Sequence, residues 1–432
     1  MAARVGSPRA GLRGTLAVPG DKSIAHRAVL LGSLAEGISA VHGLPDGADV
    51  GSTIAAMRSL GVRIDQQEST ARIEGQGLGL GANGRVEIDC GNSGTTMRLG
   101  AGLLAGGEGR YVLDGDASLR RRPMERVAAP LRQMGAVVET TDGRAPVTVA
   151  GGRLHAIDWA TPVASAQLKS AVLLAGLRAK GITRVREPLL SRDHTERLLA
   201  HMGGRVTHSA GAVTVEGGRP LRAVEFAIPG DVSSAAFFVV AALLVAGSQV
   251  EVLGVGINPT RTGVLDLLRR MGARIEIVNT REVAGETIGD LVVQTQALHA
   301  TTIGADDIPG AIDELPILCV AAALAKGETT ISGAEELRVK ESDRLAALEQ
   351  LTLLGVPVQS RPDGLVIAGS AGRPLRGAAV RTFGDHRIAM AFAIAGLVSA
   401  EPVTLDDAEC ARVSFPGFFS QLRDLGGAVE ET

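Results

Sequence analysis

Charged and hydroxyl-bearing residues stand at the start of apolar segments in this sequence. The stretch GDKSIAHRAVLL, residues 20–31, is mostly apolar, yet it opens with Lys22, Ser23 and Arg27. Ser23 is a good helix cap, and apolar residues then recur at helical spacing, which predicts a buried helix. Ser23 and Arg27 would share one face near the helix start, where free N–H groups favour phosphate or carboxylate. The alternative is a capped helix with two solvated cations.

The same arrangement, polar or charged residues beside an apolar run, recurs along the chain. Small residues such as Gly94 allow an anionic ligand to approach backbone N–H groups closely. Taken singly, each motif is also explained as a tight turn, a polar cap or a solvated charge run. The residues are Asn92, Ser93, Gly94, Thr95 and Arg98; Arg120, Arg121 and Arg122; Ser165, Gln167 and Lys169; Ser191, Arg192 and His194; Asp231, Ser233 and Ser234; Asp313 and Glu314; Lys340, Glu341 and Arg344; and Asp385, His386 and Arg387.

Carboxylates also occur in these motifs, and convergence of the helix starts would place Asp313 and Glu341 beside the cations. Lys340 and Arg344 are like charges on adjacent helical turns, which destabilises a helix unless a negative group lies between them. Arg binds carboxylate or phosphate through paired hydrogen bonds, and Lys acts as a point charge. Asp313 and Glu341 are therefore candidate acid–base groups. If the starts of the apolar segments converge, they line one anion-binding cleft between two domains.

A short phrase that recurs six times indicates the elements that position these residues. In MRSLGVRID at residue 57 and LRRMGARIE at residue 268, an amphipathic helix ends, a glycine follows and an alternating strand begins. The copies lie roughly 70 residues apart. We expect each glycine to take the left-handed conformation that ends a helix. The six glycines are Gly61, Gly135, Gly203, Gly272, Gly355 and Gly426.

An apolar segment, such as VSSAAFFVVAALLVAG, lies between successive copies of the phrase. A helix that is apolar on every side is buried on every side. Six such helices, alternating with amphipathic helices and short strands, predict an α/β protein of six βα units, three in each of two domains. The domain boundary is expected between Gly203 and the apolar helix near residue 233. The helices exclude a six-bladed propeller.

The composition is typical of a globular protein of more than one domain. The chain has 432 residues, of which 45% are hydrophobic and 21% are charged. A net charge of −3 gives no overall basic field for nucleic acid, and 2% aromatic residues offer few rings for stacking on bases. The longest apolar runs are shorter than a membrane span, and the N-terminal residues lack the apolar core of a signal peptide.

The cysteines and the missing motifs narrow the chemistry further. Cys90, Cys319 and Cys410 have no metal-like spacing, which favours a reducing compartment, and we expect a cytoplasmic protein. The sequence has no phosphate-binding GxxxxGK[ST] loop and no His and Cys cluster, so neither nucleotide hydrolysis nor zinc chemistry is indicated. We expect small-molecule substrates, no cofactor or metal, no nucleic acid or membrane partner, and a monomer.

Six motifs, in their order and at their intervals, resemble a known family. PGDKSIAHRA, GNSGTTMR, RRPM, SAQLKSA, LRVKESDRL and GDHRIAMA resemble the EPSP synthase family, whose members transfer the enolpyruvyl group of phosphoenolpyruvate to the 5-hydroxyl of shikimate 3-phosphate. The resemblance covers nearly the whole chain. It implies two inside-out α/β domains, each of three βαβαββ units, formed by residues 21–236 and by residues 1–20 plus 237–432, with the active site in the cleft between them.

The resemblance also implies roles for individual residues, and because both substrates are polyanions it accounts for the cations. The catalytic residues would be Asp313, Glu341 and Lys22. Asp313 would take the proton of the 5-hydroxyl and Glu341 would protonate the methylene carbon of phosphoenolpyruvate. Arg192 would add a contact to shikimate 3-phosphate, and Thr95 would support the loop at Gly94. Shikimate 3-phosphate would be bound by Lys22, Ser23, Arg27, Ser165, Ala166, Gln167, Asp313 and Lys340. Phosphoenolpyruvate would be bound by Lys22, Gly94, Arg122, Gln167, Arg344 and Arg387.

The chain departs from the pattern of some relatives in a few places. A lysine that precedes the terminal SFP in those relatives is absent, which leaves Arg412 or nothing in its role. Ala166 stands where others have Ser, and Leu99 where others have Pro. Gly94 leaves room for glyphosate, an analogue of bound phosphoenolpyruvate, so we expect inhibition.

Two other readings are possible on this sequence. An enolpyruvyl transferase that acts on UDP-N-acetylglucosamine would share the fold and the donor. Members of that family have a Lys–Asn pair where this chain has Lys22 and Ser23. They also carry a cysteine in the loop that here reads SLRRRPM. A catalytically inactive anion-binding homologue would keep the cations without turnover.

Overall fold

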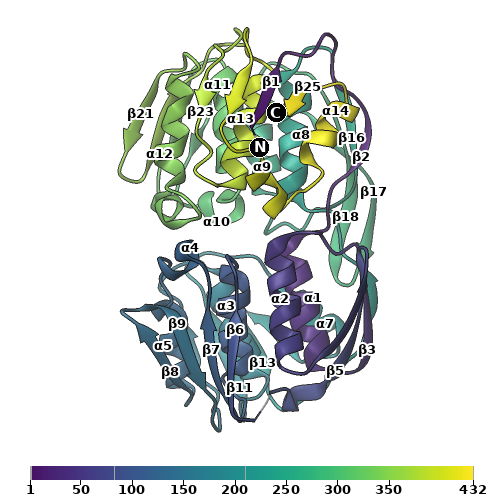
Figure 1. Cartoon of the computed structure of the whole chain (residues 1–432), viewed down its shortest axis with the longest axis vertical. Coiled ribbons are helices and arrows are strands. Elements are labelled where there is room, and N and C mark those ends of the chain that lie inside the picture. The colour runs from purple at the N-terminus through teal and green to yellow at the C-terminus, as the bar shows by residue number, and fades with distance from the viewer. Residues whose placement is uncertain (1, 82, 210, 432) are drawn as a thin grey trace. The chain divides into compact units, whose positions relative to one another are not determined.

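The structure is a computed structural model that describes residues 2–81, 83–209 and 211–431, and its chain divides into two compact units (Figure 1). Unit 1 comprises Met1–Pro19, Pro229–Arg281 and Thr287–Thr432, and unit 2 comprises Gly20–Ile228 and Glu282–Glu286. Residues 1 and 432, the outer ends of the predicted domain ranges, lie outside the described residues. The predicted boundary at residue 236 would cut helix α8 (Val232–Leu244), which lies whole in unit 1.

Unit 2 contains three mixed sheets with three apolar helices among them. The strand orders are β14-β3-β5-β4 with β15 also beside β3, β6-β7-β9-β8, and β10-β11-β13-β12. The strands are β3 (Ala35–His42), β4 (Arg63–Gln67), β5 (Thr70–Gln76), β6 (Arg85–Asp89), β7 (Arg110–Asp114), β8 (Val137–Thr141), β9 (Arg144–Ala150), β10 (Asp158–Ala160), β11 (Ile182–Arg186), β12 (Val206–Ser209), β13 (Ala212–Glu216), β14 (Leu221–Arg222) and β15 (Glu225–Ala227). The helices are α1 (Lys22–Leu34), α2 (Ala48–Ser59), η1 (Gly77–Gly79), α3 (Gly94–Leu104), α4 (Ala117–Arg120), α5 (Glu125–Gln133), α6 (Ala166–Gly176) and α7 (His194–His201).

Unit 1 repeats this plan, and the N-terminal segment completes two of its sheets. The strand orders are β17-β18-β16-β2, β19-β20-β22-β21 and β23-β24-β1-β25. The strands are β1 (Ala3–Gly6), β2 (Arg13–Ala17), β16 (Gln249–Gly256), β17 (Ile275–Val283), β18 (Glu286–Gln294), β19 (Thr302–Ile303), β20 (Glu328–Ile331), β21 (Val358–Arg361), β22 (Gly364–Ala368), β23 (Ala379–Val380), β24 (Val403–Leu405) and β25 (Ala428–Glu431). The helices are α8 (Val232–Leu244), α9 (Gly263–Arg270), α10 (Ile308–Ala311), α11 (Leu315–Leu324), η2 (Glu335–Val339), α12 (Arg344–Leu348), η3 (Glu349–Thr352), α13 (His386–Gly396), η4 (Glu409–Val413) and α14 (Phe418–Asp424).

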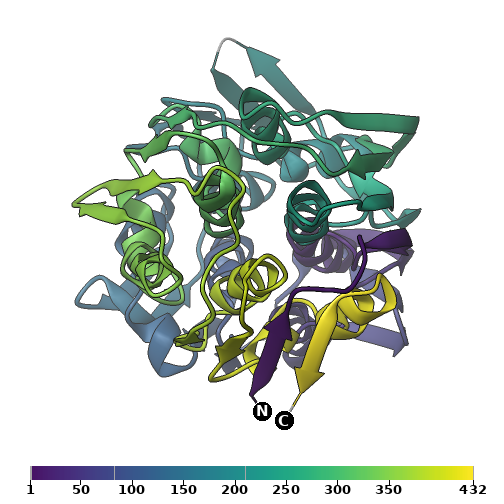
Figure 2. The ribbon, with the colours of Figure 1, turned by 90° about the horizontal axis from the view of Figure 1, so that it is seen from above.

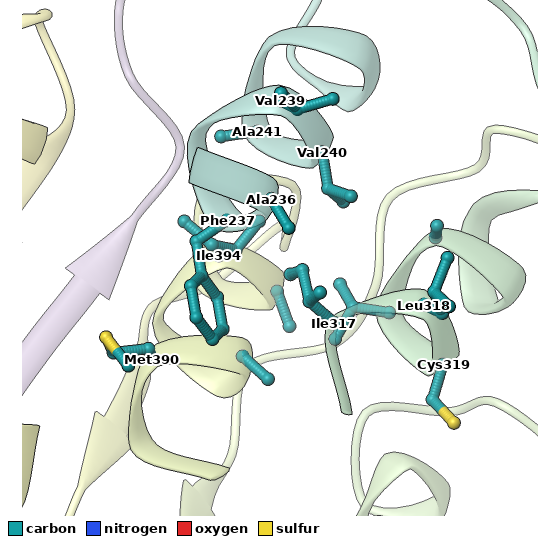
Figure 3. Packing of buried hydrophobic residues seen from close by; sticks show 14 of the residues in the cluster. Ala236, Phe237, Val239, Val240, Ala241, Ile317, Leu318, Cys319, Met390 and Ile394 are labelled. Atoms are coloured by element: carbon teal, nitrogen blue, oxygen red, sulfur yellow. The ribbon is translucent and has the colours of Figure 1, made fainter. Parts of the chain in front are cut away.

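The six apolar helices form the centres of the two units, as their composition predicts. In unit 1, α8, α11 and α13 pack against one another, and Figure 2 shows them nearly end-on with strands toward the edge. In Figure 3 side chains of these helices, among them Phe237, Ile317 and Ile394, fill the space between them. In unit 2, α3 packs against both α1 and α6. In the part of the chain that the structure describes, no helix has the length and apolar character needed to cross a membrane.

The six glycines of the repeated phrase all adopt the predicted left-handed conformation. Their φ angles lie between +82° and +105°, at the point where each amphipathic helix ends. A residue with a Cβ rarely adopts this conformation, whereas glycine adopts it at no steric cost. The prediction from the repeat is therefore confirmed at every copy: Gly61, Gly135, Gly203, Gly272, Gly355 and Gly426.

A close approach between two central helices depends on a glycine. A Cβ built on Gly102 of α3 would lie 2.2 Å from the carbonyl oxygen of Ala171 in α6 and 2.6 Å from its Cα. The obstructing atoms belong to helix backbone, so they cannot move aside without separating the two helices. Gly102 therefore sets the spacing between α3 and α6, whose first turns carry several predicted site residues.

We expect Gly102→Ala to destabilise the protein by about 1–3 kcal/mol, the usual cost of overpacking a core. The measurement is the midpoint of urea unfolding. An unchanged slope of the transition shows that the shift in midpoint reports a change in stability. Gly51→Ala is the matched control, because Gly51 lies exposed in α2 with nothing within 4 Å of a Cβ. That change should raise stability by about 0.4–1 kcal/mol. Equal effects of the two substitutions would contradict the packing argument.

Candidate active site

The predicted site residues lie in both units, most of them at or beside the first turns of the apolar helices. Unit 2 holds Lys22, Ser23, Arg27, Gly94, Thr95, Arg122, Ser165, Ala166, Gln167 and Arg192, and unit 1 holds Asp313, Lys340, Glu341, Arg344 and Arg387.

The first turn of α1 differs in one respect from the prediction. Asp21, not Ser23, caps the helix, and its carboxylate accepts a hydrogen bond from the backbone N–H of Ile24 at 2.9 Å. An aspartate placed before the helix satisfies that donor, so the helix begins at Lys22 and Ser23 lies within its first turn. The ammonium of Lys22 forms a 2.8 Å ion pair with Asp49 of α2 and keeps about a quarter of its side chain exposed.

Arg27 is buried and is held by hydroxyl groups from two other elements. Its Nε donates to Thr195 Oγ1 at 2.6 Å and its Nη2 donates to Ser170 Oγ at 2.9 Å. Its Nη1 donates to the carbonyl of Ser23 at 2.8 Å. Burial lowers the pKa of Arg27 to about 10, which leaves the guanidinium charged at neutral pH. The cation is thus fixed at the start of α1 before any ligand arrives.

The start of α3 lies between two guanidinium groups. Ser93 caps the helix, and a Cβ at Gly94 would lie 3.0 Å from Nη1 of Arg98 and 3.3 Å from Nη1 of Arg122. Arg122 is buried and donates to Asn92 Oδ1 at 2.7 Å. A small residue at position 94 therefore keeps open the space in front of the helix N–H groups and beside both cations.

Gln167 connects the start of α6 to the start of α3. Its Oε1 accepts from Arg98 Nη1 at 2.5 Å, and its Nε2 donates to Thr95 Oγ1 at 2.9 Å. Ser165 caps α6 by accepting from the backbone N–H of Leu168, and Ala166 is the first helical residue. The SAQLKSA and GNSGTTMR motifs, far apart in the sequence, are therefore neighbours in unit 2.

A buried chain of hydroxyl groups fixes α1, α2 and α3 behind this site. His26 Nδ1 lies 2.6 Å from Thr53 Oγ1, which lies 2.6 Å from Thr96 Oγ1. The hydroxyl of Thr96 in turn donates to Ser93 Oγ, the cap of α3. Burial lowers the pKa of His26 from 6.5 to about 3, and the nearby cations Lys22 and Arg27 add to this effect. His26 is therefore neutral at pH 7.

In unit 1 the carboxylate of Asp313 lies between two cations. Asp313 Oδ1 is 3.5 Å from Nζ of Lys340 and 3.6 Å from Nη1 of Arg344. This carboxylate supplies the negative group that the like charges at 340 and 344 require. The predicted continuous helix over these residues is wrong, because η2 ends at Val339 and α12 begins at Arg344 with Asp343 as its cap.

Arg344 is buried and shared by three carboxylates. Its Nε donates to Asp385 Oδ2 at 2.8 Å, and its Nη2 donates to Glu341 Oε2 at 2.7 Å. Burial lowers the pKa of Arg344, but Asp385, Glu341 and Asp313 outweigh burial and raise it. Burial alone would raise the pKa of Asp385, but the charge of Arg344 outweighs burial and leaves that pKa below its ordinary value. Both groups therefore stay charged over the whole range in which the protein is expected to work.

Arg387, at the start of α13, joins this group through the backbone. Its Nη1 donates to the carbonyl of Asp313 at 2.9 Å and lies 3.9 Å from the carboxylate of Glu314. Glu314 is buried and also accepts a hydrogen bond from Ser233 at the start of α8. Arg261 completes the set, donating to Ser233 Oγ at 2.7 Å. The starts of α8, α11 and α13 are thus fastened together by charged groups.

Some of the predicted cations are not part of either group. In the run of three arginines only Arg122 is buried, whereas Arg120 pairs with Asp114 at the surface and Arg121 is exposed. Arg412 is exposed and pairs with Glu409 within η4 at 2.8 Å. It does not stand out as a replacement for the lysine that some relatives carry there.

The sequence reasoning missed several residues that hold the site in place. Asp49 and Thr195 lie at the starts of amphipathic helices, where an unremarkable cap explains them equally well. Ser170 is a small residue inside an apolar run, and Arg261 follows a proline in a loop. Glu187 and Glu196 pair with Lys169 only through the tertiary fold, so no spacing in the sequence signals them.

The arrangement suits the binding of small anions and proton transfer. Buried or half-buried guanidinium groups next to helix N-termini favour phosphate and carboxylate. Two carboxylates, Asp313 and Glu341, lie beside Arg344 and are available to exchange protons with a bound ligand. Among the described residues no group of three or more His, Cys, Asp or Glu side chains is arranged to hold a metal ion.

Comparisons with known proteins agree along nearly the whole chain. The model of one family, described as EPSP synthase (3-phosphoshikimate 1-carboxyvinyltransferase), matches residues 7–422. A 3-phosphoshikimate 1-carboxyvinyltransferase of Geobacter sulfurreducens is 50% identical over 96% of this chain and 97% of its own length. The 3-phosphoshikimate 1-carboxyvinyltransferase of Gloeobacter violaceus is 51% identical over 96% of this chain and 97% of its own length.

A solved structure agrees with the fold as well. The EPSP synthase from Acinetobacter baumannii superposes with a TM-score of 0.89 at 40% identity, covering 99% of both chains. The predicted fold class, two inside-out α/β domains of three units each, is thereby confirmed.

The buried neutral histidine gives a pH-dependent contribution to stability. The unfolded chain binds a proton at His26 below about pH 6.5, whereas the folded protein does so only near pH 3. The contribution of neutral His26 to the free energy of unfolding is therefore fully present above pH 6.5 and is lost as the pH falls toward 3. Between pH 7 and pH 5 we expect a loss of about 2 kcal/mol from His26.

The measurement is the free energy of unfolding by urea at several pH values for the wild type and for His26→Gln. The difference between the two curves should narrow by about 2 kcal/mol from pH 7 to pH 5, since glutamine does not titrate. His208→Gln, at an exposed position in β12, is the matched control and should leave the wild-type curve almost unchanged. Parallel curves for the wild type and His26→Gln would show that the histidine is not buried in its neutral form.

Proposed function

The chain belongs to the EPSP synthase family, and from this premise we propose how its own residues bind the two substrates and carry the reaction. Its activity is that of a 3-phosphoshikimate 1-carboxyvinyltransferase, the enolpyruvyl transferase of the shikimate pathway. The observation that carries this conclusion is identity of about half of all residues over nearly the full length of relatives with that activity. The alternative activity on UDP-N-acetylglucosamine is not favoured.

The first part of the proposal assigns shikimate 3-phosphate chiefly to unit 2. Arg27, held by Thr195 and Ser170, would receive the phosphate together with Ser23. Lys22 would contact both substrates, since part of its side chain remains exposed. The helix start at Ser165, Ala166 and Gln167 would bind the phosphate and the ring, with Arg192 as a further contact.

The second part assigns phosphoenolpyruvate to cations of both units. The open space at Gly94, next to the N–H groups of α3 and to Arg122, would take one end of this anion. Gln167, Arg344 and Arg387 would bind it as well. The same space would admit glyphosate, which is consistent with an inhibitor that occupies the phosphoenolpyruvate site.

The third part concerns the proton transfers. Asp313 would accept the proton of the 5-hydroxyl while that oxygen bonds to C2 of phosphoenolpyruvate, and Lys340 would help to orient the hydroxyl. Glu341 would donate a proton to C3, which completes a tetrahedral intermediate. Glu341 would then take a proton back from C3 as the bond from C2 to the phosphate oxygen breaks, giving the enol ether and phosphate.

The ion pairs of the free protein support the role of Asp313 as the proton acceptor. Asp313 is stabilised as an anion by Lys340 and Arg344, and a bound substrate anion competes for the same cations. When the substrate takes over part of that positive field, the carboxylate becomes a better proton acceptor. Exclusion of water from the bound substrates would strengthen the effect.

We propose further that the enzyme works as a monomer in the cytoplasm. The three cysteines are buried and unpaired, and burial raises the pKa of each thiol to about 12. Such thiols are unreactive and are typical of a protein from a reducing compartment. Size-exclusion chromatography with light scattering tests the monomer directly, and a dimeric mass at micromolar concentration would contradict it.

The function is tested by phosphate release from phosphoenolpyruvate by the purified protein. We expect release only when shikimate 3-phosphate is also present, and none with UDP-N-acetylglucosamine in its place. Asp313→Asn should lower kcat by about 10²–10⁴-fold, because it removes the proton acceptor with little change in shape. Binding of shikimate 3-phosphate should be kept or become tighter, since the amide keeps the same volume and removes a negative charge beside Lys340 and Arg344.

Asp266→Asn in α9 is the control, because its carboxylate is exposed and its ion-pair partner among the described residues is the surface residue Arg269. It should leave kcat unchanged. Near-normal turnover by Asp313→Asn would show that another group takes the proton. Phosphate release without shikimate 3-phosphate would overturn the proposed reaction.

A further inference from the structure

Three buried charged side chains in unit 2 take no part in the reaction as proposed. The ammonium of Lys169 in α6 lies 2.7 Å from Glu187 Oε2 and 2.9 Å from Glu196 Oε1. The side chains are 2%, 6% and 1% exposed, so these ion pairs are shielded from solvent. We call Lys169, Glu187 and Glu196 the buried ion triad.

The buried ion triad lies beside the residues that hold Arg27. Thr195 directly precedes Glu196 and accepts from Arg27 Nε at 2.6 Å. Ser170 directly follows Lys169 and accepts from Arg27 Nη2 at 2.9 Å. The two hydroxyls also hydrogen-bond each other at 2.6 Å. Any shift of α6 against α7 therefore moves the two groups that aim the guanidinium of Arg27.

The triad also fixes the loop that leads to Arg192. Glu187 accepts a hydrogen bond from the hydroxyl of Ser191 at 2.5 Å, and Lys169 donates to the carbonyl of Ser191 at 3.2 Å. Ser191 is buried, and Arg192 follows it in the chain. Lys169 thus touches both carboxylates and the backbone next to a second predicted contact of shikimate 3-phosphate.

The charges of Arg27 and the buried ion triad sum to zero, while Asp21, Arg192 and Glu286 also act on Arg27. Lys169 and Arg27 contribute two positive charges, and Glu187 and Glu196 contribute two negative charges. Glu196 is the group that most strongly counters the effect of burial on the pKa of Arg27, ahead of Asp21. Coulomb interactions between buried groups are weakly screened by solvent, so removing one charge of the set changes the potential at Arg27.

We propose that the buried ion triad is a positioning and charge-balancing device for shikimate 3-phosphate, and that Lys169 is its central residue. The inference rests on the proposed function, in which Arg27 binds that substrate. Lys169 offsets one of the two carboxylates, so that the positive charge of Arg27 remains available to the substrate phosphate. Without Lys169, the excess negative charge of Glu187 and Glu196 opposes binding of the anion.

A purely structural role for the triad makes a different prediction. If Lys169 only fastens α6 to α7, the loss of any member weakens substrate binding whatever the sign of its charge. If the charge balance matters, loss of the positive charge weakens binding of shikimate 3-phosphate, whereas loss of a negative charge leaves it unchanged or strengthens it. The two ideas are therefore separated by the sign of the substitution.

The experiment is calorimetric titration of shikimate 3-phosphate into the full-length wild type, Lys169→Met, Glu187→Gln and the double variant. We expect Lys169→Met to raise Kd by about tenfold, as one uncompensated charge several ångströms away predicts. Glu187→Gln should bind as tightly as the wild type or more tightly. Lys169→Met/Glu187→Gln restores the balance and should bind within about threefold of the wild type.

A steady-state measurement supplies the second readout. Lys169→Met should raise the KM of shikimate 3-phosphate and leave the KM of phosphoenolpyruvate unchanged. Lys180→Met is the matched control, because Lys180 is exposed in the same unit beyond the end of α6, and it should not alter Kd. If Lys169→Met fails to fold by circular dichroism, the other two variants still carry the test, since neither leaves two buried carboxylates without a lysine.

The outcomes that overturn the inference are specific. The inference is overturned if the double variant binds shikimate 3-phosphate as weakly as Lys169→Met does. It is also overturned if Glu187→Gln binds about tenfold more weakly than the wild type, or if Lys169→Met binds with the wild-type Kd. Failure of the wild type to bind shikimate 3-phosphate would instead overturn the proposed function. The two failures are therefore distinguishable in one series of titrations.

Discussion

Pairing of buried charges is the constraint on which this structure depends. An isolated ion in a protein interior is very costly, whereas an ion with a counter-charge and satisfied hydrogen bonds is tolerated. Arg27 and Lys169, near the starts of the apolar helices α1 and α6, and Arg344, at the start of the short helix α12, are buried, and each has hydroxyl or carboxylate partners within hydrogen-bond distance. The all-apolar helices make such sites possible, because they remove water from everything but their first turns.

The same pairing prepares the chain for its substrates. The cations of the free protein are held in place by its own carboxylates and hydroxyls, so little ordering remains to be done when an anion arrives. Lys22 with Asp49, and Lys340 with Asp313, are half-buried pairs whose cations a substrate would share in the proposed function. Arg344 is buried, and in the free protein its bonds to Asp385 and Glu341 hold the guanidinium that the proposed function assigns to phosphoenolpyruvate.

Much of this organisation was predictable from the sequence, since local patterns determine it. The repeated phrase predicted all six left-handed glycines, and the apolar runs predicted the six central helices. What the sequence could not provide were partners that only the tertiary fold brings close, such as Glu187 and Glu196 with Lys169. It also misplaced the cap of α1, where Asp21 and Ser23 are equally good candidates by type, and it joined Lys340 and Arg344 into one helix.

The central claim, that buried and paired cations at the helix starts divide the two anionic substrates between them, is tested most directly by one titration. Shikimate 3-phosphate is titrated into Arg27→Ala and into Arg122→Ala. The account predicts that Arg27→Ala weakens binding by about 10–100-fold, the value of hydrogen bonds to a charged group, while Arg122→Ala changes it by less than about threefold. Equal affinities of the two variants, whether both weakened or both unchanged, would contradict it.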